Sequence, residues 1–313
     1  MSISYEQLEK WRRRGDDKKS SKTYDFFVKI LKEHCSDIIE VNDDNVFLQG
    51  SYVNHTNIKD DSDIDIVVLA KNVFYNNAKE VLNETQYKQF KERYSDSSKR
   101  LEEFKEQIYK KLNGIKIQNN VYMQLKRGCK TIKFNEGGNL MDFVPVDIVP
   151  AFEYRKYSGY NGINKENQVE GIEIYDACKD EYIINYPKLH IENGKNKDSE
   201  TRTDCNYKET IRIFKQIRNC LIDTGVIREE LMPSYALECL LYNVPDTLFK
   251  KNLVERVDSI IEWLSQNLYK EFIEQNGMYY LFTPSNGKKE ATIKREDAKL
   301  FIERCIWLSK NWR

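Results

Sequence analysis

Two aspartates near residue 64 have the spacing of metal ligands. Asp63 and Asp65 flank Ile64 at the start of a short apolar run, 64–69, which reads as a strand. Side chains alternate between faces along a strand, so both carboxylates would point the same way, about 6–7 Å apart, while Ile64 and Ile66 face the core. Such carboxylates repel one another unless a cation lies between them, and Mg²⁺ prefers oxygen ligands and bridges to phosphates. The spacing therefore predicts a magnesium site.

A third aspartate, Asp147, lies inside a second strongly apolar run, 143–150, where an acid has no evident structural role. Beside the first strand it would complete a three-carboxylate site for two metal ions. In such a site one ion activates an attacking hydroxyl and the other holds a triphosphate and its leaving group. Asp142 competes for this role, but it begins the run, and its odd spacing from Asp147 predicts the opposite face. Asp60 and Asp61 are expected in a solvated loop.

Gly50 and Ser51 follow the apolar run 46–49 and predict a strand-to-helix turn. Glycine lets the backbone approach a phosphate, and the serine hydroxyl and the N–H groups of the next turn can bind anionic oxygens. A Gly-Ser turn, or two spaced aspartates, is by itself usually structural. The combination of this turn with two acidic strands is what favours catalysis.

The elements that must position these residues form a mixed sheet followed by helices. The apolar periodicities predict helices at 4–14, 22–36 and 76–112 and strands at 46–49, 64–69, 121–126, 131–134 and 141–149. Polar loops are expected at 158–170 and 192–206, and helices at 207–224, 234–244, 252–269 and 296–311. We therefore expect an N-terminal α/β lobe and a helical C-terminal lobe.

The composition is that of a soluble globular protein, with 40% hydrophobic and 32% charged residues in a chain of 313. Basic and acidic residues balance at 50 each, so the global charge gives no attraction to nucleic acid. Without an apolar run of about 18 residues or a signal peptide, a cytoplasmic location is expected. The seven cysteines are scattered and never form CxxC, which favours reduced thiols over a disulfide framework or a zinc site.

The Gly-Ser turn, the Asp-x-Asp pair and the distant aspartate resemble the nucleotidyltransferase superfamily. Within it, segments 146–152 and 231–238 resemble the CD-NTases, bacterial relatives of cyclic GMP-AMP synthase and oligoadenylate synthase. The resemblance implies an α+β, DNA polymerase β-like nucleotidyltransferase fold. It further implies a catalytic lobe over 1–180, a helical lobe over 181–313, and an active site in the cleft between them.

The resemblance also carries over residues of the C-terminal helices. Lys215 would contact the donor triphosphate, Ser234 would hydrogen-bond it, and Tyr235 would stack on a base. These roles suit the side chains, because a lysine ammonium is a compact charge for phosphate and an aromatic face accepts any base. Arg212 and Arg218 are alternatives for the phosphate contact. The alternative, purely structural interpretations are that Lys215 is a solvated helix lysine and that Tyr235 is a core tyrosine.

The same resemblance counts Gln49 with Gly50 and Ser51 as nucleotide-binding residues. It implies two Mg²⁺ or Mn²⁺ ions and the joining of nucleoside triphosphates, with loss of pyrophosphate, into a cyclic di- or oligonucleotide. A separate effector would sense this second messenger in anti-phage (CBASS) signalling.

Two departures from the family pattern argue against a nucleic-acid activator. The zinc-binding Cys/His insertion of cyclic GMP-AMP synthase is absent, and no strongly basic stretch occurs. Transfer to an RNA, protein or small-molecule acceptor is the alternative activity. A nucleotide-binding module with a dead site is a third possibility, which the intact triad Asp63, Asp65 and Asp147 disfavours.

Overall fold

Packing divides the chain into two compact units. The computed structural model describes residues 3–15, 18–58, 63–95, 99–118, 121–135, 140, 142–160, 166–284 and 290–312. The sheet unit consists of Asp17–Gln49 and Asp63–Pro187, and the helical unit of Met1–Asp16, Gly50–Ser62 and Lys188–Arg313. The functional lobes expected over 1–180 and 181–313 stay a prediction. By packing, the N-terminal residues and Gly50–Ser62 belong with the C-terminal helices.

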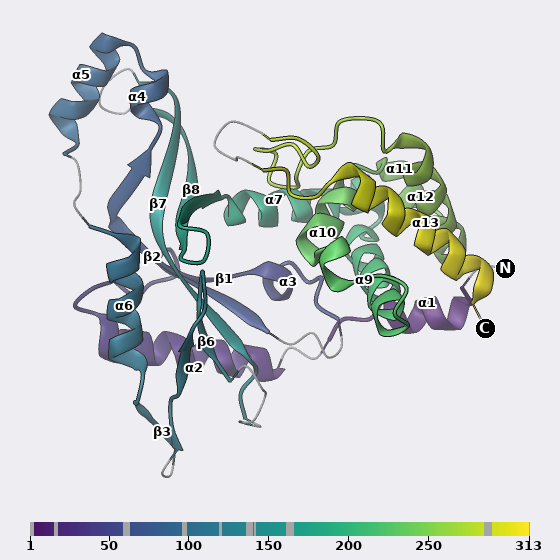
Figure 1. Ribbon diagram of the computed structural model, residues 1–313, viewed down its shortest axis with the longest axis horizontal. Coiled ribbons are helices and arrows are strands. Elements are labelled where there is room, and N and C mark those ends of the chain that lie inside the picture. Colours follow the sequence, from purple (N-terminus) through teal and green to yellow (C-terminus); the bar gives the residue numbers. More distant parts are fainter. Residues whose placement is uncertain are drawn as a thin grey trace. The chain divides into compact units, whose positions relative to one another are not determined.

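Seven strands in the described part of the sheet unit form one mixed sheet (Figure 1). They are β1 Val46–Gln49, β2 Ile64–Asn76, β5 Leu125–Arg127, β6 Ile132–Phe134, β7 Val146–Tyr160, β8 Glu166–Asp176 and β9 Glu181–Asn185. Strands β1, β2, β7, β6 and β5 are neighbours in that order, and β8 and β9 continue from β7. Strands β2 and β7 pair in parallel, with β6 and β8 both antiparallel to β7 on its other edge.

One face of this sheet is covered by helices. Ile66 is fully buried there. The ring of Phe27 in α2 packs on that of Phe134 in β6, with ring centroids 5.2 Å apart. The ring of Phe104 in α6 packs on that of Phe152 in β7, with centroids 5.4 Å apart. The remaining elements of the unit are α2 Lys18–Cys35, α4 Ala78–Val81, α5 Glu84–Arg93, α6 Leu101–Leu112 and a separate hairpin of β3 Lys116–Gln118 and β4 Val121–Tyr122.

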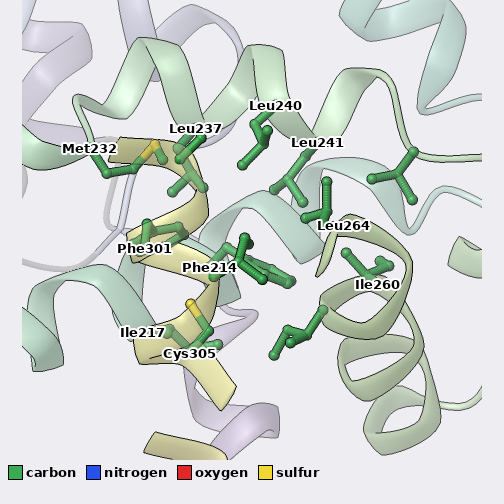
Figure 2. Close-up of a cluster of buried hydrophobic side chains, with 14 of the residues drawn as sticks. Phe214, Ile217, Met232, Leu237, Leu240, Leu241, Ile260, Leu264, Phe301 and Cys305 are labelled. Atoms are coloured by element: carbon green, nitrogen blue, oxygen red, sulfur yellow. The ribbon is translucent and has the colours of Figure 1, made fainter. Parts of the chain in front are cut away.

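The helical unit is built around α9, whose apolar residues recur every three or four positions. Figure 2 shows Phe214 of α9 in one cluster with Leu237 of α10, Ile260 of α12 and Phe301 of α13. All four side chains are fully buried, so truncating Phe214 to alanine would cost about 3–5 kcal/mol. The helices are α1 Tyr5–Trp11, α3 Gly50–Val53, α7 Pro187–Lys197, α8 Glu200–Thr203, α9 Tyr207–Asp223, η1 Glu229–Leu231, α10 Ser234–Tyr242, α11 Asp246–Phe249, α12 Leu253–Asn267 and α13 Arg295–Asn311.

The α+β class predicted from sequence is confirmed, with a mixed sheet and a helical C-terminal part. None of the described helices is both long and apolar enough to cross a membrane. Several local predictions were wrong. The expected loop 158–170 contains the end of β7 and the start of β8, because the two strands pair through polar residues. The expected loop 192–206 contains most of α7 and all of α8.

Other boundaries also differ from expectation. Strand β2 continues to Asn76, and the long helices predicted over 76–112 are, in the described residues of that stretch, the shorter helices α4, α5 and α6. The predicted strand 141–149 begins only at Val146, because Asp142 and Phe143 lie in a turn. Strand β7 then extends to Tyr160.

The expectation that the cysteines are reduced was wrong for one pair, since Cys129 and Cys178 form a disulfide. Cys129 lies in the turn between β5 and β6, and Cys178 lies in the turn between β8 and β9. These turns meet because β6 and β8 share one edge of β7, and the Ala177 N–H donates to the Cys129 carbonyl at 3.0 Å. The other cysteines are free, and burial raises the pKa of the Cys35 thiol to about 11.

Candidate active site

Strands β2 and β7 bring two of the predicted carboxylates together. Asp65 lies directly opposite Asp147 in the parallel register, and neighbouring strands are about 4.8 Å apart. Both aspartates are half-buried, whereas Ile64 and Ile66 on the alternate face are fully buried. The two carboxylates therefore project from the sheet face opposite to α2 and α6.

The other acids considered from sequence lie at the strand margins. Asp63 immediately precedes β2 and is exposed. Asp142 is exposed in the turn before β7, so it has no strand partner, and the strand-face argument used against it does not apply. The register is the better reason to favour Asp147. Asp60 and Asp61 lie outside the described residues.

The donor set fits a divalent metal ion that prefers oxygen. Carboxylates directly opposite one another on a sheet are destabilising without a counter-charge, and Mg²⁺ and Mn²⁺ bind carboxylate oxygens. The carboxylate oxygens of Asp63, Asp65 and Asp147 do not all lie within 4.8 Å of one another. Among groups of three or more histidines, cysteines or acids in the described part of the chain, only Cys129, Asp176 and Cys178 have metal-ligating atoms that all lie within 4.8 Å of one another.

That tighter cluster does not have the chemistry of a metal site. Its two sulfurs are bonded to each other. The carboxylate of Asp176 accepts the Cys178 N–H at 3.0 Å and lies 3.4 Å from the Lys130 ammonium. Asp176 therefore stabilises a turn.

The row of the sheet that contains Asp65 and Asp147 has polar side chains on both sides of these two aspartates. Gln49 of β1 is the register partner of Asp65, and Lys133 of β6 is the partner of Asp147. Lys126 of β5 is in turn the partner of Lys133. Directly opposed residues share a face, so the row presents an amide, two carboxylates and two ammonium groups. Lys133 was not predicted as a site residue, because the register between β6 and β7 leaves no signal in the sequence. Its charge can offset that of Asp147 or bind a phosphate oxygen.

The predicted strand-to-helix turn is present. Strand β1 ends at Gln49, and Gly50 has a φ of 76°, which glycine adopts without strain, at the start of α3. The Gly50 carbonyl accepts the Asn54 N–H at 3.3 Å and the Asn54 side-chain amide at 2.9 Å. Ser51 is half-buried in this turn, which belongs to the helical unit.

Lys215 is not a solvated helix lysine. Its side chain is 2% exposed, and its Nζ lies 2.8 Å from Oε1 of Glu238 and 3.3 Å from Oγ1 of Thr56. Burial raises the pKa of the Glu238 carboxyl, but the Lys215 ammonium and His190 outweigh burial and hold that pKa well below its usual range. The pair is therefore charged within the protein interior.

Ser234 and Tyr235 open α10. Ser234 is half-buried. Tyr235 is 40% exposed, so it is not a core tyrosine. Its ring stacks on His190 with centroids 5.2 Å apart, and its hydroxyl donates to Oε2 of Glu274 at 2.7 Å. The ring is thus held at its edge and on one face.

The alternative phosphate ligands are bound to backbone carbonyls. Arg212 donates to the carbonyls of Arg12 and His55, both at 2.6 Å. Arg218 donates to the carbonyls of Met232 and Glu229. Both guanidinium groups connect segments of the helical unit.

Comparisons with known proteins agree with this fold. A model of the nucleotidyltransferase domain matches residues 28–156. A model of the cGAS/DncV-like nucleotidyltransferase C-terminal helical domain matches residues 192–308. The chain is therefore a nucleotidyltransferase.

Relatives along the whole chain define the family more narrowly. The cyclic UMP-AMP synthase of Rhodothermus marinus is 36% identical, over 100% of this chain and 99% of that protein. The cyclic nucleotide synthase CdnE01 of Staphylococcus haemolyticus is 33% identical, over 96% and 97%. The structure of the Rhodothermus marinus CdnE c-UMP-AMP synthase with Apcpp and Upnpp has a TM-score of 0.77 at 33% identity, over 99% and 97%. The chain belongs to the cGAS/DncV-like nucleotidyltransferases, the CD-NTases.

Proposed function

We propose that this enzyme joins nucleoside triphosphates into a cyclic di- or oligonucleotide and releases pyrophosphate. The observation that supports this most is the parallel register that sets Asp65 opposite Asp147, with Asp63 two residues before Asp65. Relatives matched over nearly their whole length are named as synthases of cyclic nucleotides. One related structure holds the nucleotide analogues Apcpp and Upnpp, which supports nucleoside triphosphates as substrates here.

In this proposal Asp63, Asp65 and Asp147 hold two Mg²⁺ or Mn²⁺ ions. When bound, two such ions lower the pKa of an attacking hydroxyl and neutralise the charge of the triphosphate and the departing pyrophosphate. The contribution of the chain is to fix the carboxylates on two paired strands. A rigid sheet keeps them in place through repeated turnovers. Lys133, opposite Asp147, adds a positive charge to the same row.

The helical unit supplies the proposed contacts to the nucleotide. Ser51 and Ser234 would hydrogen-bond the triphosphate, and the exposed face of Tyr235 would stack on a base. An ammonium has three N–H groups, and for Lys215 Glu238 and Thr56 accept two of them. The third can donate to a phosphate oxygen. Gln49, beside Asp65, would orient the nucleotide through its amide.

We further propose that the cyclic product is a second messenger, sensed by a separate effector in anti-phage signalling, and that the enzyme needs no nucleic-acid activator. Equal numbers of basic and acidic residues are consistent with the second point. Adding DNA or RNA to the purified enzyme should therefore leave the rate of pyrophosphate release unchanged. A rise of tenfold or more in that rate would contradict the proposal that no nucleic-acid activator is needed.

Product analysis tests the central proposal. Purified enzyme is incubated with all four nucleoside triphosphates and Mg²⁺ or Mn²⁺, and the products are treated with phosphatase and separated by mass. We expect a phosphatase-resistant product whose mass equals that of its nucleotides after loss of one pyrophosphate each. Linear products, or products that require an added RNA, protein or small molecule, would establish the alternative acceptor reaction. No nucleotide product under any metal condition would refute both.

A further inference from the structure

Glu238 is a buried carboxylate at which three segments of the helical unit meet. Its Oε1 accepts the Thr56 hydroxyl at 2.7 Å and pairs with the Lys215 ammonium at 2.8 Å. Its Oε2 lies 3.2 Å from Nε2 of His190. Thr56 follows α3, His190 is in α7, and Lys215 is in α9. All four residues are at least nine-tenths buried.

The charge of Glu238 fixes the direction of these hydrogen bonds. An ionised carboxylate can only accept, so the Thr56 hydroxyl donates to it and Nε2 of His190 carries the proton. An O–H···O⁻ bond of 2.7 Å is a charge-assisted bond, which is stronger than a bond between neutral groups. Loss of the charge at Glu238 would therefore weaken three contacts together.

Each of these contacts leads to a residue of the proposed nucleotide site. The Thr56 N–H donates to the Ser51 carbonyl at 2.9 Å, so Thr56 closes the Gly50-Ser51 turn. The His190 ring stacks beneath Tyr235, the proposed base platform. Lys215 is bound by Glu238 directly. Ser51, Lys215 and Tyr235 are far apart in sequence, and Glu238 connects all three.

We infer that Glu238 is a positioning residue for nucleotide binding, which acts by holding Thr56, Lys215 and His190 in one hydrogen-bonded network. This inference rests on the proposed function, because it assigns the network's purpose to the nucleoside triphosphate site. Glu238 itself touches no substrate in this account. Substitution of Glu238 should therefore lower nucleotide affinity more than a substitution elsewhere that destabilises the fold equally.

The helical unit offers a matched control. Lys197 is also buried, and its ammonium lies 2.8 Å from Asp246 and donates to the Val244 carbonyl at 2.8 Å. Asp246 pairs with Arg202 as well. Within the described chain, no hydrogen bond or ion pair joins Lys197, Asp246 or Arg202 to the Gly50-Ser51 turn or to Tyr235. Asp246→Asn therefore weakens an ion pair to a buried lysine without weakening the Glu238 network.

The test measures the Kd of Apcpp and Upnpp, with Mg²⁺, by calorimetry and the melting temperature of each variant. For the analogue that wild type binds, we expect Glu238→Gln to raise the Kd about tenfold or more, because charge-assisted contacts are lost. Thr56→Val should raise it several-fold, and Thr56→Ser, which keeps the hydroxyl, should restore it. Asp246→Asn should lower the melting temperature comparably while its Kd stays within twofold of wild type.

Coupling provides a second readout. Because Thr56 and Glu238 act in one network, the Thr56→Val, Glu238→Gln double variant should bind about as well as Glu238→Gln alone. If Glu238→Gln does not fold, the comparison of the Kd values of Thr56→Val and Thr56→Ser tests the inference by itself. Suppose that the wild type binds an analogue. If the Kd is then unchanged in Glu238→Gln and Thr56→Val, or if it rises equally in Asp246→Asn, only this inference is overturned. If wild type binds neither analogue and forms no product, the proposed function fails and the inference falls with it.

Discussion

Each unit of this enzyme buries a glutamate, and the two have opposite surroundings. Glu238 of the helical unit is bound by Lys215, Thr56 and His190, and although burial raises its pKa, Lys215 and His190 hold that pKa below the usual range. Glu173 of the sheet unit is buried on β8 opposite Phe152, and its Oε2 has no hydrogen-bond partner in the described chain. Burial raises the pKa of Glu173 to about 7.

This difference separates two uses of acidic residues. A charged carboxylate inside a protein is stable only with partners, and those partners fix the segments to which they belong. An unpartnered carboxylate takes up a proton instead. The half-buried aspartates of the sheet, Asp65 and Asp147, represent a third case, in which we propose that metal ions provide the balancing charge. Each case predicts a different response to removal of the charge.

Removing the proposed metal ligands should have the largest effect. The double variant Asp65→Asn, Asp147→Asn should lower the rate of pyrophosphate release by about 1,000-fold or more, because amides bind divalent ions poorly. Removing two opposed like charges should leave the melting temperature equal to or above that of wild type. Asp142→Asn, an exposed acid in the nearby turn, is the control and should keep full activity. Substantial activity in the double variant would refute the metal assignment.

The disulfide should have the next largest effect, and on stability rather than chemistry. Cys129 and Cys178 are separated by 49 residues, and a loop of this length corresponds to about 2–4 kcal/mol of stabilisation. Cys129→Ser, Cys178→Ser should lower the free energy of unfolding by about this amount under non-reducing conditions. The exposed free thiol Cys205 provides the control, since Cys205→Ser should change little. Equal unfolding with and without reductant in wild type would contradict the assignment.

Glu173 predicts a smaller, pH-dependent effect. Its folded-state pKa of about 7 lies above the ordinary value near 4.5, so the folded state binds the proton more tightly. The resulting stability is fully present below about pH 4.5 and is lost as the pH rises through 7, by up to about 3 kcal/mol. Glu173→Gln should lose this component of the pH dependence and be the more stable protein at pH 8. Denaturant unfolding at pH 5 and pH 8 tests this, and an unchanged pH profile in the variant would contradict it.

The sequence predicted those parts of the site that depend on local pattern. Alternation placed Asp65 on one face and Ile64 and Ile66 on the other, and apolarity placed Asp147 within a strand. The two acidic strands were proposed as neighbours from their chemistry, but the pairing of Asp65 with Asp147 depends on register, which local pattern does not determine. Lys133 was missed for the same reason.

Tertiary contacts account for the other failures. Helix α7 contains the weak helix formers Asn193 and Gly194, yet a Cβ at Gly194 would lie 2.4 Å from Nε2 of Gln275, and the Asn193 amide donates to the Gln275 carbonyl at 2.8 Å. Packing therefore sets the helix there, against its propensity. Thr56 carries no signal in sequence, because its role exists only once Glu238 is beside it.

The most direct test of the account locates the metal. Crystals of the enzyme grown with Mn²⁺ and Apcpp or Upnpp would be measured for anomalous scattering by manganese. We predict manganese bound by carboxylate oxygens of Asp65 and Asp147, with Asp63 completing the site for a second ion. Manganese found only elsewhere, or no manganese at these aspartates in a crystal that contains the nucleotide, would contradict the claim that they form the catalytic metal site.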